Sequence, residues 1–376
     1  MAESTAAQIR ILVVDDSAFM RKALTMMLES DPMIKVIATA RDGAEGVEKV
    51  KRLKPDLVTM DIEMPRMDGL TALREIMLSM PTPVMMISSL TTDGANATLD
   101  ALELGAVDFI PKQLSYVSLD IVKIKDELLA KIKDIVRRKT VLMKRLQSRS
   151  AFRKTSATQR TSIGRDGRSA AAVAPPPPRQ RVIGKRNHPV SIVIVGSSTG
   201  GPPALQTVIP RLPRNFPVGV VVAQHMPPTF TKSLAERLNQ LSQVQVKEAT
   251  HGDPIEPGTV LIAPGGQHLT VKRAGARAHA VVSSQPETTL YKPCVDVTST
   301  SVAEAYGRAT LGVMLTGMGN NGVIGFERIK SKGGVVVAQS EATCVVYGMP
   351  RAVIEAKLAD YVSSVEDIAA EIVSFF

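Results

Sequence analysis

Apolar segments and amphipathic segments alternate along the first third of the chain, and this alternation is the strongest constraint on its fold. Between residues 9 and 112, short apolar runs such as IRILVV, DLVTM and PVMMIS are separated by helix-like runs such as SAFMRKALTMMLES and DGLTALREIMLS. Buried strands that take turns with helices over short connections are typical of a parallel sheet covered by helices on both faces. The sequence therefore predicts a small doubly wound α/β domain.

A second alternating pattern begins after Pro189 and continues to the end of the chain. SIVIVG, VGVVVAQ, LGVMLTG and GGVVVAQS read as strands, with helix-like segments between them and a strand-rich stretch up to about residue 282. A chain of 376 residues is also longer than one hydrophobic core usually serves. We predict two parallel-sheet domains, residues 1–125 and 190–376, the second with inserted β-hairpins.

The segment between the domains, residues 126–189, differs from both in composition. A long helix with an apolar stripe is expected over residues 119–147, and the rest is rich in Arg, Ser, Ala and Gly, with four prolines at 175–178. Residues 115–190 hold 19 Lys and Arg against 5 Asp and Glu, an excess larger than the +10 of the whole chain. The basic charge thus belongs to a linker, either a solvated tether or a contact for an acidic surface.

Composition and pattern also limit the compartment and the partners. Cys294 and Cys344 are too few for a disulfide framework, and no run of about 18 uncharged apolar residues is present. The first residues lack the features of a secretory signal, and no helix-turn-helix pattern follows the first domain. We therefore expect a cytoplasmic protein that neither inserts into a membrane nor binds nucleic acid.

Polar side chains follow four predicted strands of the first domain. Asp15 and Asp16 come after the first strand and Asp61 ends the third, while Ser88 and Lys112 follow the fourth and fifth. Each aspartate alone is a common helix cap, but the carboxyl ends of parallel strands meet at one edge of a sheet. Three carboxylates there repel one another unless a divalent cation bridges them, and oxygen ligands suit Mg²⁺. A carboxylate nucleophile that accepts a phosphoryl group fits this set.

These residues carry a resemblance to response-regulator receiver domains over roughly residues 8–125. The matching motifs are VVDDS at 13–17, MDIEMPRMDG at 60–69, SS at 88–89 and LGAVDFIPK at 104–112. The resemblance implies a flavodoxin-like fold with a Mg²⁺ site. It also implies these roles: Asp61 as phospho-acceptor, Asp15, Asp16 and Asp61 as metal ligands, Ser88 as switch hydroxyl and Lys112 as phosphate-contacting base.

A Gly-rich turn with hydroxyl groups follows the first strand of the second domain. IVIVGSSTGG exposes Ser198 at the end of a buried strand, and the following amides point toward the same space. The next strand, VGVVVAQHM, delivers His225 at its own end, so a nucleophile and a general base could meet. The turn could instead bind phosphate or be purely structural, although it lacks GxGxxG and the P-loop lysine. The other histidines are expected at surface or turn positions: His188, His251, His268 and His279.

From about residue 191 to the end, the chain resembles the catalytic domain of the chemotaxis methylesterases. The motifs are GSSTGG, AQHMPPTFTKSLAERL, APGGQHL, LTGMGNNG and VVYGMPRAV. The resemblance implies a Rossmann-like domain with Ser198 as nucleophile and His225 as general base. It places Thr199 beside the nucleophile and the Met318 amide in the oxyanion hole. The family pattern GMGxDG has its triad aspartate where this chain has Asn321.

Asparagine at position 321 has a definite chemical meaning. Its carbonyl oxygen could accept from Nδ1–H of His225 and hold the tautomer, but it cannot stabilise an imidazolium by charge. An amide turned the other way could lower turnover by about 10⁴-fold. The alternatives are that another carboxylate substitutes, with Asp296 as candidate, that activity is reduced, or that the variant serves another end.

Together the resemblances predict a phosphorylation-activated hydrolase of two-component chemotaxis signalling. It would act as a protein-glutamate methylesterase, and by the same route as a glutamine deamidase, on methyl-accepting chemoreceptors, through an acyl-enzyme and without a cofactor for the esterase reaction. A chemotaxis histidine kinase would phosphorylate Asp61 and so release a receiver domain that covers the esterase face. The alternative is a receiver-controlled receptor-binding protein with weak or no esterase activity because of Asn321.

Overall fold

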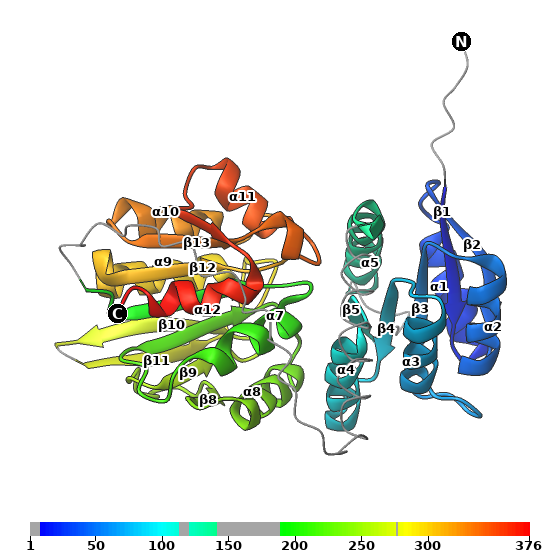
Figure 1. The fold of residues 1–376 in the computed structure, drawn as a ribbon, viewed down its shortest axis with the longest axis horizontal. Coiled ribbons are helices and arrows are strands. Elements are labelled where there is room, and N and C mark those ends of the chain that lie inside the picture. The colour runs from blue at the N-terminus through cyan, green and yellow to red at the C-terminus, as the bar shows by residue number, and fades with distance from the viewer. Residues whose placement is uncertain (1–7, 113–119, 141–188, 276) are drawn as a thin grey trace, which may run out of the picture.

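Two α/β units form the protein in the computed structural model, which describes residues 8–112, 120–140, 189–275 and 277–376. A five-stranded sheet has the order β2-β1-β3-β4-β5, and a seven-stranded sheet has the order β14-β13-β12-β6-β7-β9-β8. Every pairing in both sheets is parallel. Figure 1 shows the two units side by side, and the predicted fold of two parallel-sheet α/β domains is confirmed.

The first unit alternates strand and helix without interruption. Its first four helices begin where Ser17, Asp42, Asp68 and Thr91 accept hydrogen bonds from backbone amides of the first turn, as N-cap residues do. Its elements in chain order are β1 (Ile9–Val14), α1 (Ala18–Leu28), β2 (Ile34–Ala40), α2 (Gly43–Leu53), β3 (Leu57–Asp61), α3 (Gly69–Ser79), β4 (Val84–Ser88), α4 (Thr92–Leu104), β5 (Asp108–Pro111) and α5 (Asp120–Arg137).

Helix α5 is part of the hydrophobic core of the first unit. Leu128, Ile132 and Ile135 recur at helical spacing, are buried, and pack in one cluster with Ile11 of β1. The limit that the sequence suggests at residue 125 falls inside this helix. Residues 141–147 of the predicted helix lie outside the described residues.

The second unit is a parallel sheet with one antiparallel hairpin, β10 (His268–Ala274) and β11 (Arg277–Ser283), as expected from the sequence. Its strand order reverses between β6 and β12, and such a switch point leaves a crevice at the carboxyl ends of the strands. The other strands are β6 (Ile192–Ser197), β7 (Gly219–Gln224), β8 (Gln245–Glu248), β9 (Thr259–Ile262), β12 (Thr310–Met314), β13 (Val335–Gln339) and β14 (Tyr361–Ser363). The helices are α7 (Gly201–Val208), α8 (Phe230–Leu241), α9 (Val295–Tyr306), α10 (Val323–Ser331), α11 (Met349–Glu355) and α12 (Val365–Val373).

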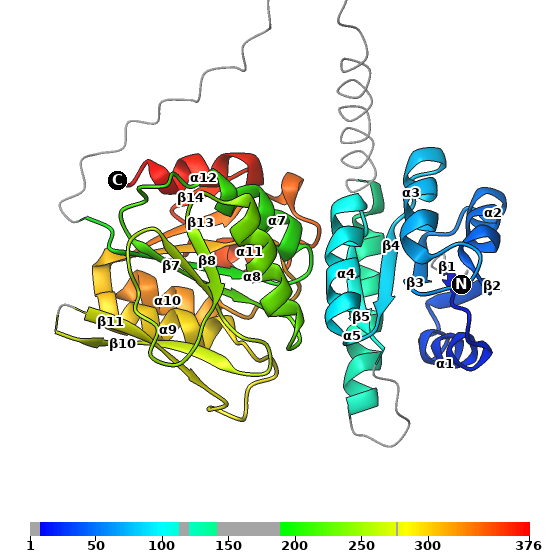
Figure 2. The same ribbon diagram turned by 90° about the horizontal axis from the view of Figure 1, so that it is seen from below.

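The two units meet through α4, β5 and α5 of the first, which face α7 and α8 of the second in both views (Figures 1 and 2). Arg237 of α8 forms ion pairs of 2.6 Å with Asp100 and with Glu103 of α4. The ring of Phe109 in β5 stacks on that of Phe230 at the start of α8, with centroids 4.7 Å apart. The contact therefore combines a charged rim with an aromatic centre.

Two composition-based features can be read from the described residues. Cys294 and Cys344 are both buried. Within the same part of the chain, no helix is both long and apolar enough to cross a bilayer.

Candidate active site and phosphorylation site

Three carboxylates gather at the carboxyl ends of β1 and β3. One oxygen from each of Asp15, Asp16 and Asp61 lies within 4.8 Å of the others, and Asp15 and Asp61 are buried. Oδ2 of Asp15 accepts no hydrogen bond within the described residues, although Nζ of Lys112 lies 3.7 Å away. Because a buried carboxylate oxygen without a donor is costly, and the set is all oxygen, these residues fit a divalent cation such as Mg²⁺.

Lys112 crosses this acidic cluster from the end of β5. Its Nζ lies 2.5 Å from Oδ2 of Asp61, and its backbone N–H donates to the Ser88 carbonyl at 2.6 Å. Burial raises the pKa of Asp61 to about 6, although the Lys112 ammonium opposes this effect. Burial likewise raises the pKa of Asp15. A cation between the carboxylates would favour their charged forms, which this environment otherwise disfavours.

Ser88 is completely buried, and its hydroxyl is bonded to α4. Its Oγ lies 3.1 Å from the carbonyl oxygen of Gly94 and accepts from Oγ1 of Thr98 at 2.7 Å. The end of β4 is thereby tied to the first turns of α4, the helix that carries the ion pairs to Arg237. The predicted switch hydroxyl thus stands between the acidic cluster and the interface.

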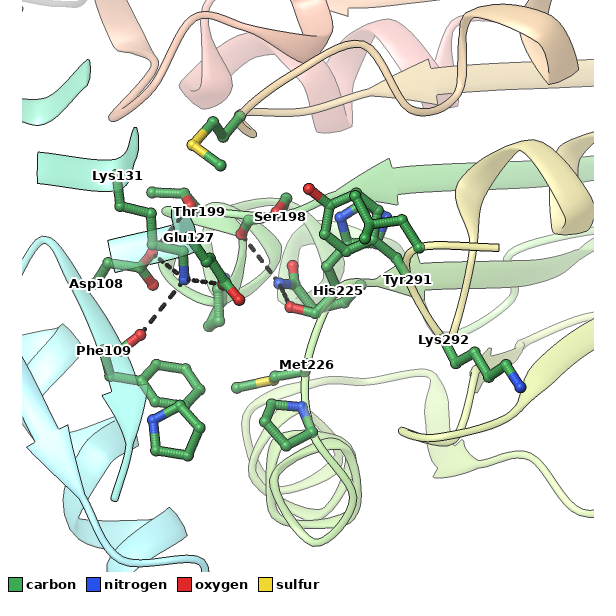
Figure 3. Close-up of a pocket in the computed structure, with 16 residues that line it drawn as sticks. Asp108, Phe109, Glu127, Lys131, Ser198, Thr199, His225, Met226, Tyr291 and Lys292 are labelled. Atoms are coloured by element: carbon green, nitrogen blue, oxygen red, sulfur yellow. Dashed lines mark hydrogen bonds and ion pairs between the residues drawn. The ribbon is translucent and has the colours of Figure 1, made fainter. Parts of the chain in front are cut away.

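The predicted catalytic residues of the second unit meet at its switch point. Ser198 follows β6 and His225 follows β7, and both line one pocket of about 200 Å³ together with Thr199 and Met318 (Figure 3). Asn321 lies in the loop after β12 and contacts His225. The structure therefore brings together all five residues that the sequence assigns to this site.

Gln224 holds the two strand ends in place. Its Oε1 accepts from Oγ of Ser197 at 2.6 Å, and its Nε2 donates to the carbonyl oxygens of Ser198 and His225, both at 3.0 Å. A side chain at Gly201 would collide with Gln224, since a Cβ there would lie 1.8 Å from Oε1. Sequence reasoning missed Gln224, although it directly precedes the histidine in the AQHM motif.

His225 contacts Asn321 through the ring nitrogen opposite to the one predicted. Nε2, not Nδ1, lies 2.9 Å from Oδ1 of Asn321, while Nδ1 is buried without a hydrogen bond within the described residues. The ring stacks on Tyr291, with centroids 4.3 Å apart, and this contact helps to fix its orientation. Burial lowers the pKa of His225 to about 4, although the hydrogen bond with Asn321 opposes this effect. The imidazole is therefore neutral near pH 7, as a general base must be.

The carboxamide of Asn321 is bonded at both ends. Its Oδ1 also accepts from the backbone N–H of Val295 at 2.8 Å, and its Nδ2 donates to Oδ2 of Asp296 at 2.7 Å and to Sγ of Cys294 at 3.2 Å. Asp296 thus bonds to the asparagine and not to the histidine. The expectation that Asp296 could replace the triad acid against His225 is wrong, because Asn321 lies between them.

The first unit lines the same pocket through β5 and α5 (Figure 3). Oγ1 of Thr199, beside the candidate nucleophile, donates to Oδ2 of Asp108 at 2.9 Å. Nζ of Lys131 lies 2.9 Å from that same oxygen and 2.9 Å from Oε1 of Glu127. Burial alone would lower the pKa of Lys131, but the two carboxylates hold it above its ordinary value. Lys131 in turn lowers the pKa of Glu127, so both side chains are charged.

Glu127 places a carboxylate from a helix in the pocket of Ser198 and His225. Its charge acts on His225 and opposes the lowering of the histidine pKa by burial. The side chain stays 44% exposed, so solvent still reaches the pocket beside it. Sequence reasoning missed Glu127 and Lys131, because their spacing of four residues is that of any helical ion pair and only docking brings them to the site.

The structure corrects one expectation for the remaining histidines. His268 is completely buried, where its Nδ1 accepts from the backbone N–H of Cys294 at 3.2 Å and its Nε2 lies 3.0 Å from Oγ1 of Thr289. A surface or turn role for His268 is therefore wrong, since it supports the start of α9. His188 lies outside the described residues.

Family models match both units of the chain: "Response regulator receiver domain" over residues 11–121 and "CheB methylesterase" over residues 193–372. The fold and the two sites thus define a class, a response regulator whose output domain is of a hydrolase family. The chain is 51% identical over 97% of its length to "Protein-glutamate methylesterase/protein-glutamine glutaminase 1" of Oleidesulfovibrio alaskensis, and covers 99% of that relative. A second such protein, from Nitratidesulfovibrio vulgaris, has the same identity and coverage. The chain belongs to the protein-glutamate methylesterase/protein-glutamine glutaminase family.

Solved structures resemble each unit separately. The Thermotoga maritima CheB methylesterase catalytic domain is 45% identical, with a TM-score of 0.49, and the match covers 50% of this chain and 99% of that one. The response regulator domain of Thermotoga maritima CheB is 52% identical, with a TM-score of 0.32, and the match covers 35% and 97%.

Proposed function

We propose that the protein hydrolyses glutamyl methyl esters, and deamidates glutaminyl side chains, in methyl-accepting chemoreceptors. The observation that carries this proposal is the meeting of Ser198 with a neutral His225 in one pocket at the switch point of the sheet. The names of the relatives supply the substrate class. The contact between His225 and Oδ1 of Asn321 favours turnover over a purely receptor-binding role, because the asparagine can still hold the histidine.

In the proposed mechanism, Oγ of Ser198 attacks the γ-carbonyl carbon while Nδ1 of His225, the nitrogen that Asn321 leaves free, takes the hydroxyl proton. Backbone amides after the nucleophile and the Met318 amide stabilise the oxyanion. Collapse breaks the ester C–O bond, or the C–N bond of an amide, and the imidazolium gives its proton to the leaving group, which departs as methanol or as ammonia. Water then attacks the acyl-enzyme with His225 again as base, which releases glutamate and restores Ser198.

When the first unit is docked on the second, as in this structure, it limits access of the substrate to Ser198 and His225. Within the described residues, Oγ of Ser198 has no hydrogen bond to His225, and such bonds often form only with substrate present. Glu127 is chemically the product of both reactions, a glutamate carried on a helix, and it lines the pocket that the substrate must enter. The receiver therefore competes with the substrate for one space.

We further propose that a chemotaxis histidine kinase phosphorylates Asp61 and thereby undocks the receiver. Asp15, Asp16 and Asp61 would hold Mg²⁺, which neutralises charge on phosphoryl oxygens when bound. Lys112 stands where it would pair with the new oxygens. If the Ser88 hydroxyl turned from Gly94 toward the phosphoryl group, α4 would lose its hydrogen bond to β4. Because α4 carries the ion pairs to Arg237, its movement would weaken the contact between the two units.

The test is methanol release from methylated receptor membranes, with and without a small phosphodonor and Mg²⁺. We expect release that rises with the phosphodonor and is absent in Ser198→Ala, which keeps the fold and the docking surface. Absence of release under either condition, with the protein folded, would instead support the receptor-binding function.

A further inference from the structure

The orientation of the Asn321 carboxamide decides which nitrogen of His225 carries its proton. We propose that Asp296 fixes this orientation and is a positioning residue for the reaction, one that lets an amide serve where the family pattern has an aspartate. The inference rests on the proposed function of Ser198 and His225. It concerns a side chain that does not touch the histidine.

Two hydrogen bonds, one to Asp296 and one from Val295, admit only one orientation of the amide. The carboxylate of Asp296 has no proton to donate, so the group 2.7 Å away must be the NH₂ of Asn321. The backbone N–H of Val295 can only donate, so the group 2.8 Å away must be the carbonyl oxygen. If the amide were reversed, its oxygen would face the carboxylate oxygen of Asp296 and its NH₂ would face the N–H of Val295.

Asp296 is itself held so that it cannot turn away. It lies in the first turn of α9, and its Oδ1 accepts from the backbone N–H of Gly325 in α10 at 2.9 Å. A Cβ at Gly325 would lie 3.0 Å from the Asp296 carbonyl oxygen, so the two helices approach closely at this point. The carboxylate is therefore clamped between α9 and α10 with Oδ2 aimed at Asn321.

The orientation of the Asn321 amide determines the tautomer of His225 through the hydrogen bond between Oδ1 and Nε2. Because Oδ1 of Asn321 is an acceptor, Nε2 of His225 must carry the hydrogen of the neutral ring, which leaves the lone pair on the buried and unpartnered Nδ1. An aspartate at position 321 would accept through either oxygen and would need no such support. An asparagine needs it, because without Asp296 only the Val295 N–H opposes the reversed amide, which would favour the proton on Nδ1 and block the base.

A double-mutant cycle separates this role from simple anchoring of α9 to α10. We expect Asp296→Ala to lower phosphodonor-stimulated methanol release by between about tenfold and 10⁴-fold, the upper end being the wrong-tautomer loss of a serine protease triad. In an Asn321→Asp background, the same substitution should cost little. The matched control is Glu304→Ala, which removes ion pairs from α9 to Arg328 and Lys332 of the neighbouring segment but lies away from the site.

Equal losses from Asp296→Ala in both backgrounds, or no loss in either, would overturn the proposal. Absence of release even from the unsubstituted chain would instead refute the proposed function, and the tautomer can then be read directly. The ¹⁵N chemical shifts of His225, assigned by comparison with His225→Gln, should report a proton on Nε2 in the unsubstituted chain and a mixed or reversed tautomer in Asp296→Ala. An unchanged Nε2 proton in that variant would also overturn the proposal.

Discussion

At the scale of single residues, the protonation of His225 links the site to pH. Burial lowers the pKa of this imidazole to about 4, against 6.5 in an exposed setting. The unfolded chain therefore takes up a proton below pH 6.5 that the folded chain does not bind until about pH 4. The contribution of the neutral, buried His225 to the free energy of unfolding is therefore complete above pH 6.5 and is lost as the pH falls from 6.5 to about 4.

We expect the second unit to lose about 2 kcal/mol of unfolding free energy between pH 7 and pH 5, relative to a His225→Gln variant that cannot titrate there. Urea titrations of both proteins at the two pH values, followed by a probe in the second unit, measure the difference. Parallel behaviour of the two proteins would show that the histidine is not shielded as the structure indicates.

Residue identity also explains which parts of the site could be predicted. Ser198, His225 and the acidic cluster follow strands whose ends must converge, so chain order alone places them together. The choice of Nε2 over Nδ1 at Asn321 depends on the tilt of a ring stacked on Tyr291, and no sequence pattern encodes that tilt. The sequence offered Asp296 only as a carboxylate that could replace the triad acid. Its actual contact with Asn321 depends on how closely α9 and α10 approach each other.

At the scale of elements, the contact between α4 and α8 restrains the docked state. Arg237 pairs with Asp100 and Glu103, which are 51% and 39% exposed, so solvent weakens each pair to a contribution of up to about 1 kcal/mol. We expect Arg237→Ala, which removes both pairs, to raise methanol release without phosphodonor by up to about 30-fold and to leave stimulated release unchanged.

Lys232→Ala is the matched control for this experiment, because it removes a cation from the exposed face of the same helix. Equal effects of the two substitutions would mean that the net charge of α8, and not its pairing with α4, controls the rate.

The elements of the two domains were predictable because periodicity reports burial within a domain. The same pattern does not report which face meets the other domain. In α5, Leu128 and Ile132 mark the inner face, whereas Glu127 and Lys131 look like an ordinary solvated ion pair. Glu127 and Lys131 reach the pocket of Ser198 and His225 only because the two units dock. Docking depends on the surfaces of two folded domains and cannot be predicted from one segment.

At the scale of the whole molecule, the proposed mechanism makes Glu127 a competitor of the substrate for the pocket of Ser198 and His225. Its removal takes a carboxylate out of the pocket and, with it, the charge that acts on His225 across the interface. We expect Glu127→Ala to raise release without phosphodonor by about fivefold, the equivalent of ~1 kcal/mol of lost exclusion of the substrate side chain from the pocket. Stimulated release should stay the same.

Asp126→Ala removes the preceding carboxylate of α5, which is 68% exposed, and serves as the control. If Glu127→Ala left unstimulated release at the level of this control, the glutamate would be a bystander in the pocket.

Strand β5 joins the two sites more directly than any other element. Asp108 at its first position bonds to Thr199 beside the nucleophile, and the residue after its last position, Lys112, bonds to Asp61. Asp108 and Lys112 therefore lie four positions apart in the chain, one at the pocket of Ser198 and the other at Asp61. Equilibrium coupling between two sites acts equally in both directions. If phosphorylation opens the pocket, then a filled pocket must favour phosphorylation.

An enzyme bound to its receptor would thus be phosphorylated more readily by the kinase than a free one. The receptor would then affect the receiver, just as the receiver affects the reaction at the receptor. We expect a bulky sulfonyl group on Ser198 to raise the affinity of the receiver for beryllofluoride with Mg²⁺, measured by titration, with identically treated Ser198→Ala as control. Unchanged affinity would show that the strand transmits nothing. A rise would mean that the receiver senses whether the pocket is filled, so that information also passes from the output domain back to the input domain.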